Sequence, residues 1–121
     1  MSNVKGMAIA LACLISMPAL AEDTLDQLHV VMAALADAKL AVTQCPQYKI
    51  NGIEFTLWAV KEKLSAKDME SSRMVLFTLL RTNSMLEAQK EAGQNNGERC
   101  DSWWRMYGPD GHEHPNLLLR L

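Results

Sequence analysis

The residues of this sequence best suited to metal chemistry are two histidines near the C-terminus, His112 and His114. In an extended chain, side chains two residues apart point to the same side, so this pair could share a copper or zinc ion. Asp110 could add a third ligand. Two histidines do not make a closed zinc site, and the alternative is an exposed polar tail. The spacing therefore indicates weak metal binding at most, and we expect no cofactor.

A pair of cysteines, Cys45 and Cys100, is the second feature with its own chemistry. The third cysteine, Cys13, falls in a segment that we expect to be removed on export. The sequence contains no CxxC motif, and no histidine lies at metal-ligand spacing from either member of the pair. A structural disulfide is therefore favoured over a redox or metal-binding pair. Such a bridge would close a long loop and, by the chain-entropy argument, contribute about 4 kcal/mol of stability.

The most unusual local composition is the aromatic cluster at 103–107, which reads Trp-Trp-Arg-Met-Tyr. Aromatic residues and arginine are enriched at protein-binding hot spots. The alternative is that this segment packs against the core beside the disulfide. Two adjacent tryptophans on a helix diverge by about 100°, so one can be buried while the other is exposed. The candidate interaction surface consists of Trp103, Trp104, Arg105 and Tyr107.

Residues 1–21 have the three parts of a cleavable secretory signal peptide. Lys5 is followed by an uncharged apolar run, and Ala19-Leu20-Ala21 supplies a small-x-small cleavage site. The apolar run is too short to span a bilayer, which takes about 20 residues. We therefore expect residues 22–121 to be exported, to the periplasm or the medium, as one helical domain that does not span a membrane.

The charge of the expected mature chain is modest. Residues 22–121 keep all 14 acidic residues and 11 of the 12 basic ones, because Lys5 is removed, which gives a formal charge of −3. No basic patch or stripe is present, so nucleic acid is not an expected partner. One hundred residues suit a single domain.

The segments that would position these residues are mainly helical. Residues 24–43 have apolar side chains at spacings of three and four, with Thr24 as a cap, and Pro46 ends this helix. Asn51-Gly52 is a hairpin signal, but Asn51 can also cap a helix. Helical spacing continues beyond it, so we expect a short extended piece and then a helix over 52–64. Its shared face is formed by Ile53, Leu57, Val60 and Leu64.

Two further helices complete the expected fold. Residues 65–92 read as the longest helix, and its centre, 74–80, is apolar nearly all round, which predicts the most buried element. Residues 98–107 form a short last helix with Cys100 on its aromatic face, followed by an irregular tail. Because Cys45 and Cys100 each lie on an apolar face, the bridge should pin the last helix against the end of the first. The sequence thus predicts an all-α bundle of about four helices stapled by one disulfide.

Three functions fit these features. The sequence has no nucleophile elbow, phosphate-binding loop or haem-attachment motif, so we expect no enzyme. The first hypothesis is a protein-binding module of the bacterial envelope, whose partner is another envelope or secreted protein. The second is a periplasmic acid or stress chaperone. In layout the chain is similar to the acid-stress periplasmic chaperones, although no motif matches residue by residue. The third is metal binding through His112 and His114.

Overall fold

The computed structural model describes residues 26–121. The expected signal peptide at 1–21, Cys13 and the helix cap expected at Thr24 lie outside this range. Within it, no helix has both the length and the apolar composition needed to cross a membrane.

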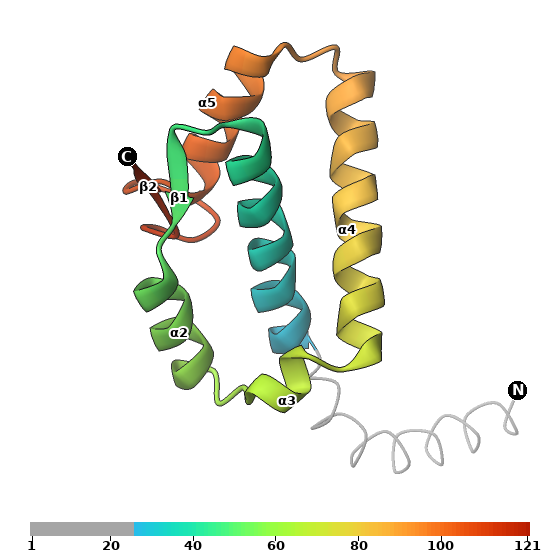
Figure 1. The fold of residues 1–121 in the computed structure, drawn as a ribbon, viewed down its shortest axis with the longest axis vertical. Helices are drawn as coiled ribbons and strands as arrows, with labels where there is room; N and C mark the ends of the chain where they lie inside the picture. The colour runs from blue at the N-terminus through green and yellow to red at the C-terminus, as the bar shows by residue number, and fades with distance from the viewer. Residues whose placement is uncertain (1–25) are drawn as a thin grey trace, which may run out of the picture.

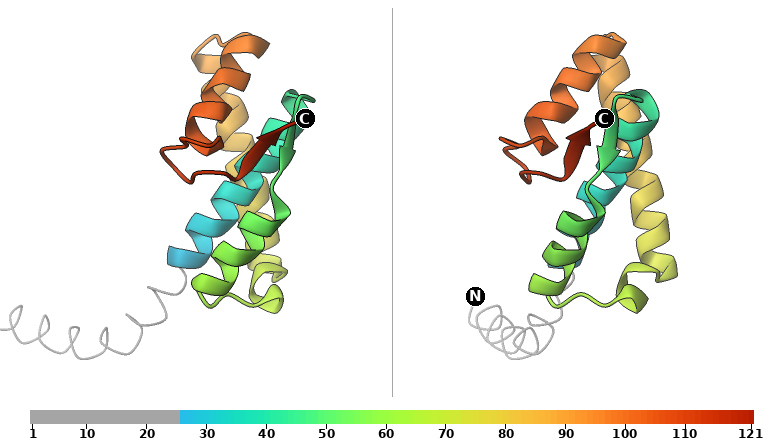
Figure 2. Two further views of the ribbon diagram at one scale, coloured as in Figure 1. Left: turned by 90° about the vertical axis from the view of Figure 1, so that its left-hand side faces the viewer. Right: turned by 60° about the vertical axis from the view of Figure 1, so that its left-hand side comes forward.

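Five helices and a two-stranded sheet make up the described part of the chain (Figure 1). The order is the first helix (26–44), β1 (Tyr48–Ile50), α2 (Gly52–Lys61), α3 (Ala66–Met69), α4 (Ser72–Glu91), α5 (Asn96–Tyr107) and β2 (Leu118–Arg120). The first helix lies between α4 on one side and α2 and α5 on the other, and it runs in the same direction as α4 (Figures 1 and 2). The expected helical bundle with one disulfide is confirmed.

Local side-chain caps explain where the helices begin. Asn51 accepts a hydrogen bond from the backbone N–H of Glu54 and caps α2. Asn95 and Glu98 form a reciprocal capping box at the start of α5. The helix expected over 65–92 is interrupted at Ser71, whose side chain accepts a hydrogen bond from the Met74 N–H and caps a new helix, so α3 and α4 are separate.

The segments before α2 and at the C-terminus pair with each other. Asn51-Gly52 does not form a hairpin; instead β1 pairs antiparallel with β2, with Lys49 opposite Leu119. The tail that we expected to be irregular therefore ends in a strand. Leu117 and Leu118 are fully buried, which anchors this strand to the core.

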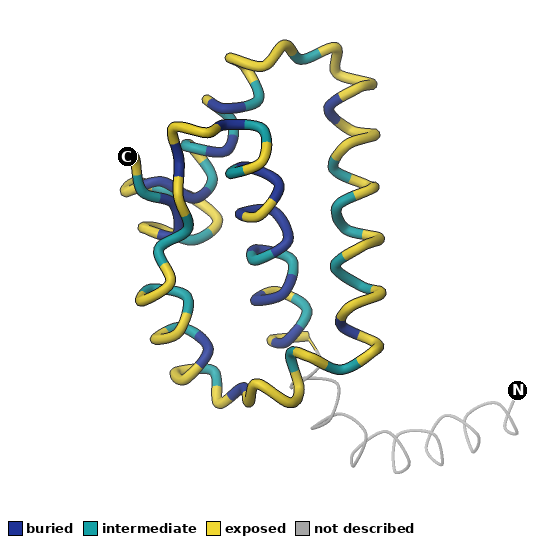
Figure 3. The backbone as a smooth tube through the Cα atoms, in the orientation of Figure 1, coloured by how far each residue is buried: buried dark blue, intermediate teal, exposed yellow. Residues whose placement is uncertain are grey.

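The first helix supplies much of the core (Figure 3). Its small side chains Ala34, Ala38 and Ala41 face a cluster that surrounds the disulfide and includes residues of α5 and β2. A second cluster joins the N-terminal half of the first helix to Leu64 and to Met74 at the start of α4. Small residues allow the neighbouring elements to approach the first helix closely.

Two expected apolar faces lie in solvent instead of in the core. On α4, Val75, Leu76, Leu79 and Leu80 are 57–60% exposed, so the prediction that 74–80 is the most buried segment is wrong. Figure 1 shows the reason: α4 lies at the edge of the bundle, with one side against the first helix. Its buried residues are Met74 and Gln89.

Three of the four residues on the expected core face of α2 are exposed, and the fourth, Leu64, is buried in the segment that follows the end of α2 at Lys61. Ile53, Leu57 and Val60 are 76%, 61% and 67% exposed. Ala59 is buried on the other side of the helix, where Phe55 and Trp58 pack against the core. The face with the two aromatic side chains buries more area than the aliphatic face, and a helix at the periphery of the bundle can bury one face.

Candidate binding surfaces

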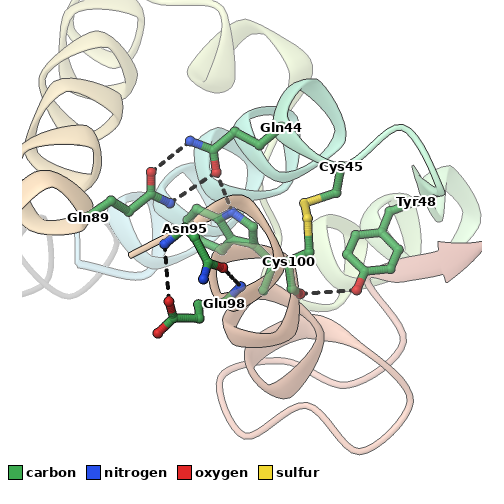
Figure 4. The surroundings of a disulfide bond; sticks show 8 residues. Gln44, Cys45, Tyr48, Gln89, Asn95, Glu98 and Cys100 are labelled. Carbon is green, nitrogen blue, oxygen red and sulfur yellow. Dashed lines mark hydrogen bonds between the residues drawn. A yellow bond between two sulfur atoms is a disulfide. The ribbon is translucent and has the colours of Figure 1, made fainter. Parts of the chain in front are cut away.

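The disulfide joins the C-terminal end of the first helix to α5 (Figure 4). The Cα atoms of Cys45 and Cys100 are 5.8 Å apart, and both side chains are buried. The Tyr48 hydroxyl donates a hydrogen bond of 3.0 Å to the carbonyl oxygen of Cys100. The structure thus confirms that the bridge pins α5 against the end of the first helix, with a tryptophan packed beside it.

That tryptophan, Trp103, is part of a buried polar network. It is 1% exposed, and its indole N–H donates to Oε1 of Gln44 at 2.9 Å. The amides of Gln44 and Gln89 exchange two hydrogen bonds, of 2.7 and 3.0 Å. Figure 4 shows the two glutamines facing each other beside the disulfide. These bonds join the first helix, α4 and α5. Trp103 therefore helps to hold the three helices together.

The rest of the aromatic cluster does not form an open surface either. Tyr107 is 3% exposed. Trp104 is half-buried: its ring stacks on Tyr48 with centroids 5.0 Å apart, and the Arg120 guanidinium lies 4.4 Å from its centroid. Arg105 is exposed. The interaction surface predicted from Trp103, Trp104, Arg105 and Tyr107 is therefore wrong as a unit, because the helix buries the face that also carries Cys100.

A buried carboxylate, which the sequence analysis did not single out, lies between three helices. Asp37 is fully buried on the first helix. Arg81 of α4 donates to both carboxylate oxygens, at 2.9 and 2.8 Å. Tyr107 of α5 donates its hydroxyl to Oδ2 at 2.6 Å.

This geometry raises the pKa of Tyr107 and of Arg81. Burial raises the pKa of Tyr107 well above its ordinary value, and the hydrogen bond to Asp37 adds to the increase. The hydrogen bond to Asp37 also raises the pKa of Arg81. The arrangement keeps the arginine charged and the tyrosine protonated. At neutral pH neither Arg81 nor Tyr107 is placed to release its proton. The cluster therefore holds the three helices together.

The two candidate metal ligands contact different groups. The His114 ring stacks on Trp58 with centroids 3.8 Å apart, and its Nε2 lies 3.0 Å from Oε1 of Glu54. The Nδ1 atom of His112 lies 3.0 Å from the carbonyl oxygen of Arg105. Within 26–121, no group of three or more His, Cys, Asp or Glu side chains is placed to hold a metal ion. His114 instead fastens the C-terminal segment to α2.

The exposed aliphatic face of α2 borders a groove. Ile53, Leu57 and Val60 lie at i, i+4 and i+7, which places them on one side of the helix; we call them the α2 stripe. Ile53 and Leu57 line a groove between α2 and the two-stranded sheet, and Lys49 and Leu119 line it from the strands. This is an apolar surface with a hollow beside it.

A second apolar surface lies on α4, away from the α2 stripe. Its exposed residues include Val75, Leu76, Leu79 and Leu80. Val75 and Leu79 also line a groove between α4 and the first helix, opposite Leu35 and Leu40. The helical spacing of these residues was visible in the sequence, but the spacing alone did not show which side of each helix would meet the core.

Comparisons with known proteins found no match: the chain matches no protein-family model, no curated protein and no solved structure. The functional argument therefore rests on the fold and its surfaces. They define a small helical domain, stapled by one disulfide, that exposes apolar faces on α2 and α4.

Proposed function

We propose that this protein is a non-catalytic protein-binding module of the bacterial envelope, and that its partner docks on the α2 stripe. The observation that carries the proposal is the exposure of Ile53, Leu57 and Val60, at 61–76%, beside the groove against the sheet. Single exposed apolar residues are ordinary on protein surfaces, whereas contiguous apolar patches mark interaction sites. A partner would remove this patch from water.

The charges around the α2 stripe indicate what kind of partner fits. Lys49 lines the groove near the start of α2, and Lys61 and Lys63 are exposed at its end. Basic side chains therefore bracket the apolar stripe. The partner that fits is a protein segment with apolar anchors and flanking acidic residues, because complementary charges at the rim set orientation and association rate.

The proposed module acts outside the cytoplasm, after export. The Cys45–Cys100 disulfide supports it, because such bonds persist in oxidising compartments. The signal peptide expected at 1–21 supports it from the sequence.

Leu57→Asp tests the proposed surface. The oxidised protein, produced from the full chain, is crosslinked in its native envelope fraction and captured, and the partner is identified by mass spectrometry. We expect one near-stoichiometric partner that Leu57→Asp loses, because a charge would be buried in the docked apolar patch. Leu86→Asp is the matched control, since Leu86 is exposed on α4 away from the stripe.

Two outcomes contradict this proposal. One is the absence of any near-stoichiometric partner, and the other is a partner that Leu57→Asp captures as well as the wild-type protein does. Circular dichroism checks that Leu57→Asp is folded, and we expect it to be folded because the Leu57 side chain is 61% exposed.

An acid-stress chaperone is the second candidate, and the buried Asp37 carboxylate favours it. This carboxylate holds α4 against the first helix through Arg81, and α4 carries exposed leucines. In acid the side chains of 22–121 would carry 11 basic residues and 3 histidines, or +14, against −3 at neutral pH, and such repulsion loosens folds. Protection of a client at acidic pH that is lost on reduction supports this function. Aggregation of the protein itself in acid excludes it.

A further inference from the structure

The outer side of α4 carries residues whose spacing is symmetric about Leu80. Leu76 and Ser84 lie four residues on either side of Leu80, and Arg73 and Glu87 lie seven residues on either side. At 100° per residue, these five side chains share one side of the helix. All five are exposed, and α4 lies at the edge of the bundle (Figure 1). We call them the α4 stripe.

We infer that the α4 stripe binds a second copy of this chain, with the two α4 helices antiparallel and Leu80 at the two-fold axis. In this arrangement, a residue before Leu80 faces the residue at the same distance after Leu80 in the other copy. Arg73 then faces Glu87, and the symmetry repeats this pair. Leu76 faces the small Ser84, which leaves room for the leucine side chain between the helices.

The pattern of charges selects this arrangement over others. Arg73 and Glu87 carry opposite charges at equal distances from Leu80, so only the antiparallel pairing brings them together. A parallel pair of α4 helices would place Arg73 against Arg73, and like charges in contact disfavour association. A partner of unrelated sequence would not require opposite charges at equal distances from one leucine.

This inference is independent of the proposed function, which uses the α2 stripe. The apolar centre of the α4 stripe, Leu76 and Leu80, would supply the area removed from water. The charged pairs at its ends would set the register and direction of the two helices. The dimer would then present two α2 stripes to partners.

Analytical ultracentrifugation of the oxidised protein over a micromolar concentration series tests the dimer. We expect a monomer–dimer equilibrium, and we expect Leu80→Asp to weaken it by roughly 30-fold or more, the loss typical of a hot-spot residue. The two introduced carboxylates would face each other at the axis. Leu57→Asp, on α2, should dimerise as the wild-type protein does. A wild-type protein that stays monomeric, or a dimer unaffected by Leu80→Asp, overturns the inference.

Charge exchange tests the antiparallel register. Arg73→Glu alone and Glu87→Arg alone should each weaken the dimer, because each places like charges opposite one another. The two substitutions together restore opposite charges and should restore dimerisation to the wild-type level. A combined variant as weak as the single variants overturns the proposed pairing. If the protein dimerises but captures no partner protein, only the proposed function is contradicted. If it captures a partner protein but stays monomeric, only the dimer inference is contradicted.

Discussion

At the Asp37 carboxylate, three helices meet through three hydrogen bonds. A fully buried carboxylate is costly unless charged and polar partners compensate it, and Arg81 and Tyr107 do so here. The carboxylate also limits where the two partners can lie, because Arg81 on α4 and Tyr107 on α5 must both reach the same side chain on the first helix. At the scale of the residue, this cluster fixes how the two outer helices are placed against the central one.

Removing the Tyr107 hydroxyl should weaken the fold and change its response to alkali. We expect Tyr107→Phe to lower the free energy of unfolding at pH 7 by about 1.5–3 kcal/mol, the value for a hydrogen bond to a charged group. The pKa of Tyr107 is raised in the folded state, so its contribution is complete below the unfolded value of about 10 and is lost as pH rises above it.

Urea unfolding from pH 7 to alkaline pH measures this effect. Above pH ~10 the stability of the wild-type protein should fall more steeply than that of Tyr107→Phe, because the variant has no proton to lose at this position. Parallel curves for the two proteins would show that the Tyr107 hydroxyl is not held by Asp37.

At the scale of the element, polar pairs decide which side of α4 faces the core. Asp37 binds Arg81, and seven residues further along the first helix Gln44 binds Gln89. Because the two helices run in the same direction, both pairs can form at once. They turn Met74 inward and leave leucines such as Leu79 outside. Two partly buried polar contacts therefore set the orientation of a helix whose segment 74–80 is apolar nearly all round.

Alanine substitutions on α4 should therefore have unequal effects. Met74 is fully buried, so Met74→Ala should cost about 2–5 kcal/mol. Leu79 is 58% exposed, so Leu79→Ala should stay within about 0.5 kcal/mol of the wild-type protein. Denaturant unfolding of the two variants measures the difference. Equal and large losses would mean that both sides of α4 are buried.

At the scale of the whole molecule, the disulfide closes the chain between the first helix and α5. The two cysteines are 55 residues apart in sequence, and the loop between them contains β1 and α2 to α4. The bridge also draws in the C-terminus, because β2 pairs with β1 directly after the first cysteine.

Loss of the disulfide should remove a large fraction of the free energy of unfolding. Replacing Cys45 and Cys100 together with alanine should cost about 4 kcal/mol, because the unfolded chain regains the entropy of an open loop. Typical domains have 5–15 kcal/mol in all. Urea unfolding of the variant, of the reduced wild-type protein and of the oxidised wild-type protein provides the comparison. Equal midpoints for the oxidised and cysteine-free proteins would contradict this expectation.

The sequence by itself determined the helical class, the start of α2 and the disulfide. The Asn51 cap acts on a backbone group three residues away, and the Cys45–Cys100 pair had no alternative partner among the residues expected after export. These features depend on near neighbours or on counting, so the residues carry the information directly. The break at Ser71 was missed because a single serine cap inside a long apolar pattern is a weak signal.

Only the tertiary structure decided which faces are buried. The apolar stripe that begins at Ile53 could have met the core, but Phe55 and Trp58 took that position. The two partners of Asp37 lie 44 and 70 residues away in sequence, and no local pattern identifies them. Burial depends on elements that approach from distant parts of the chain. The candidate binding surfaces on α2 and α4 therefore became visible when the helices were packed, whereas the aromatic cluster that the sequence favoured became part of the core.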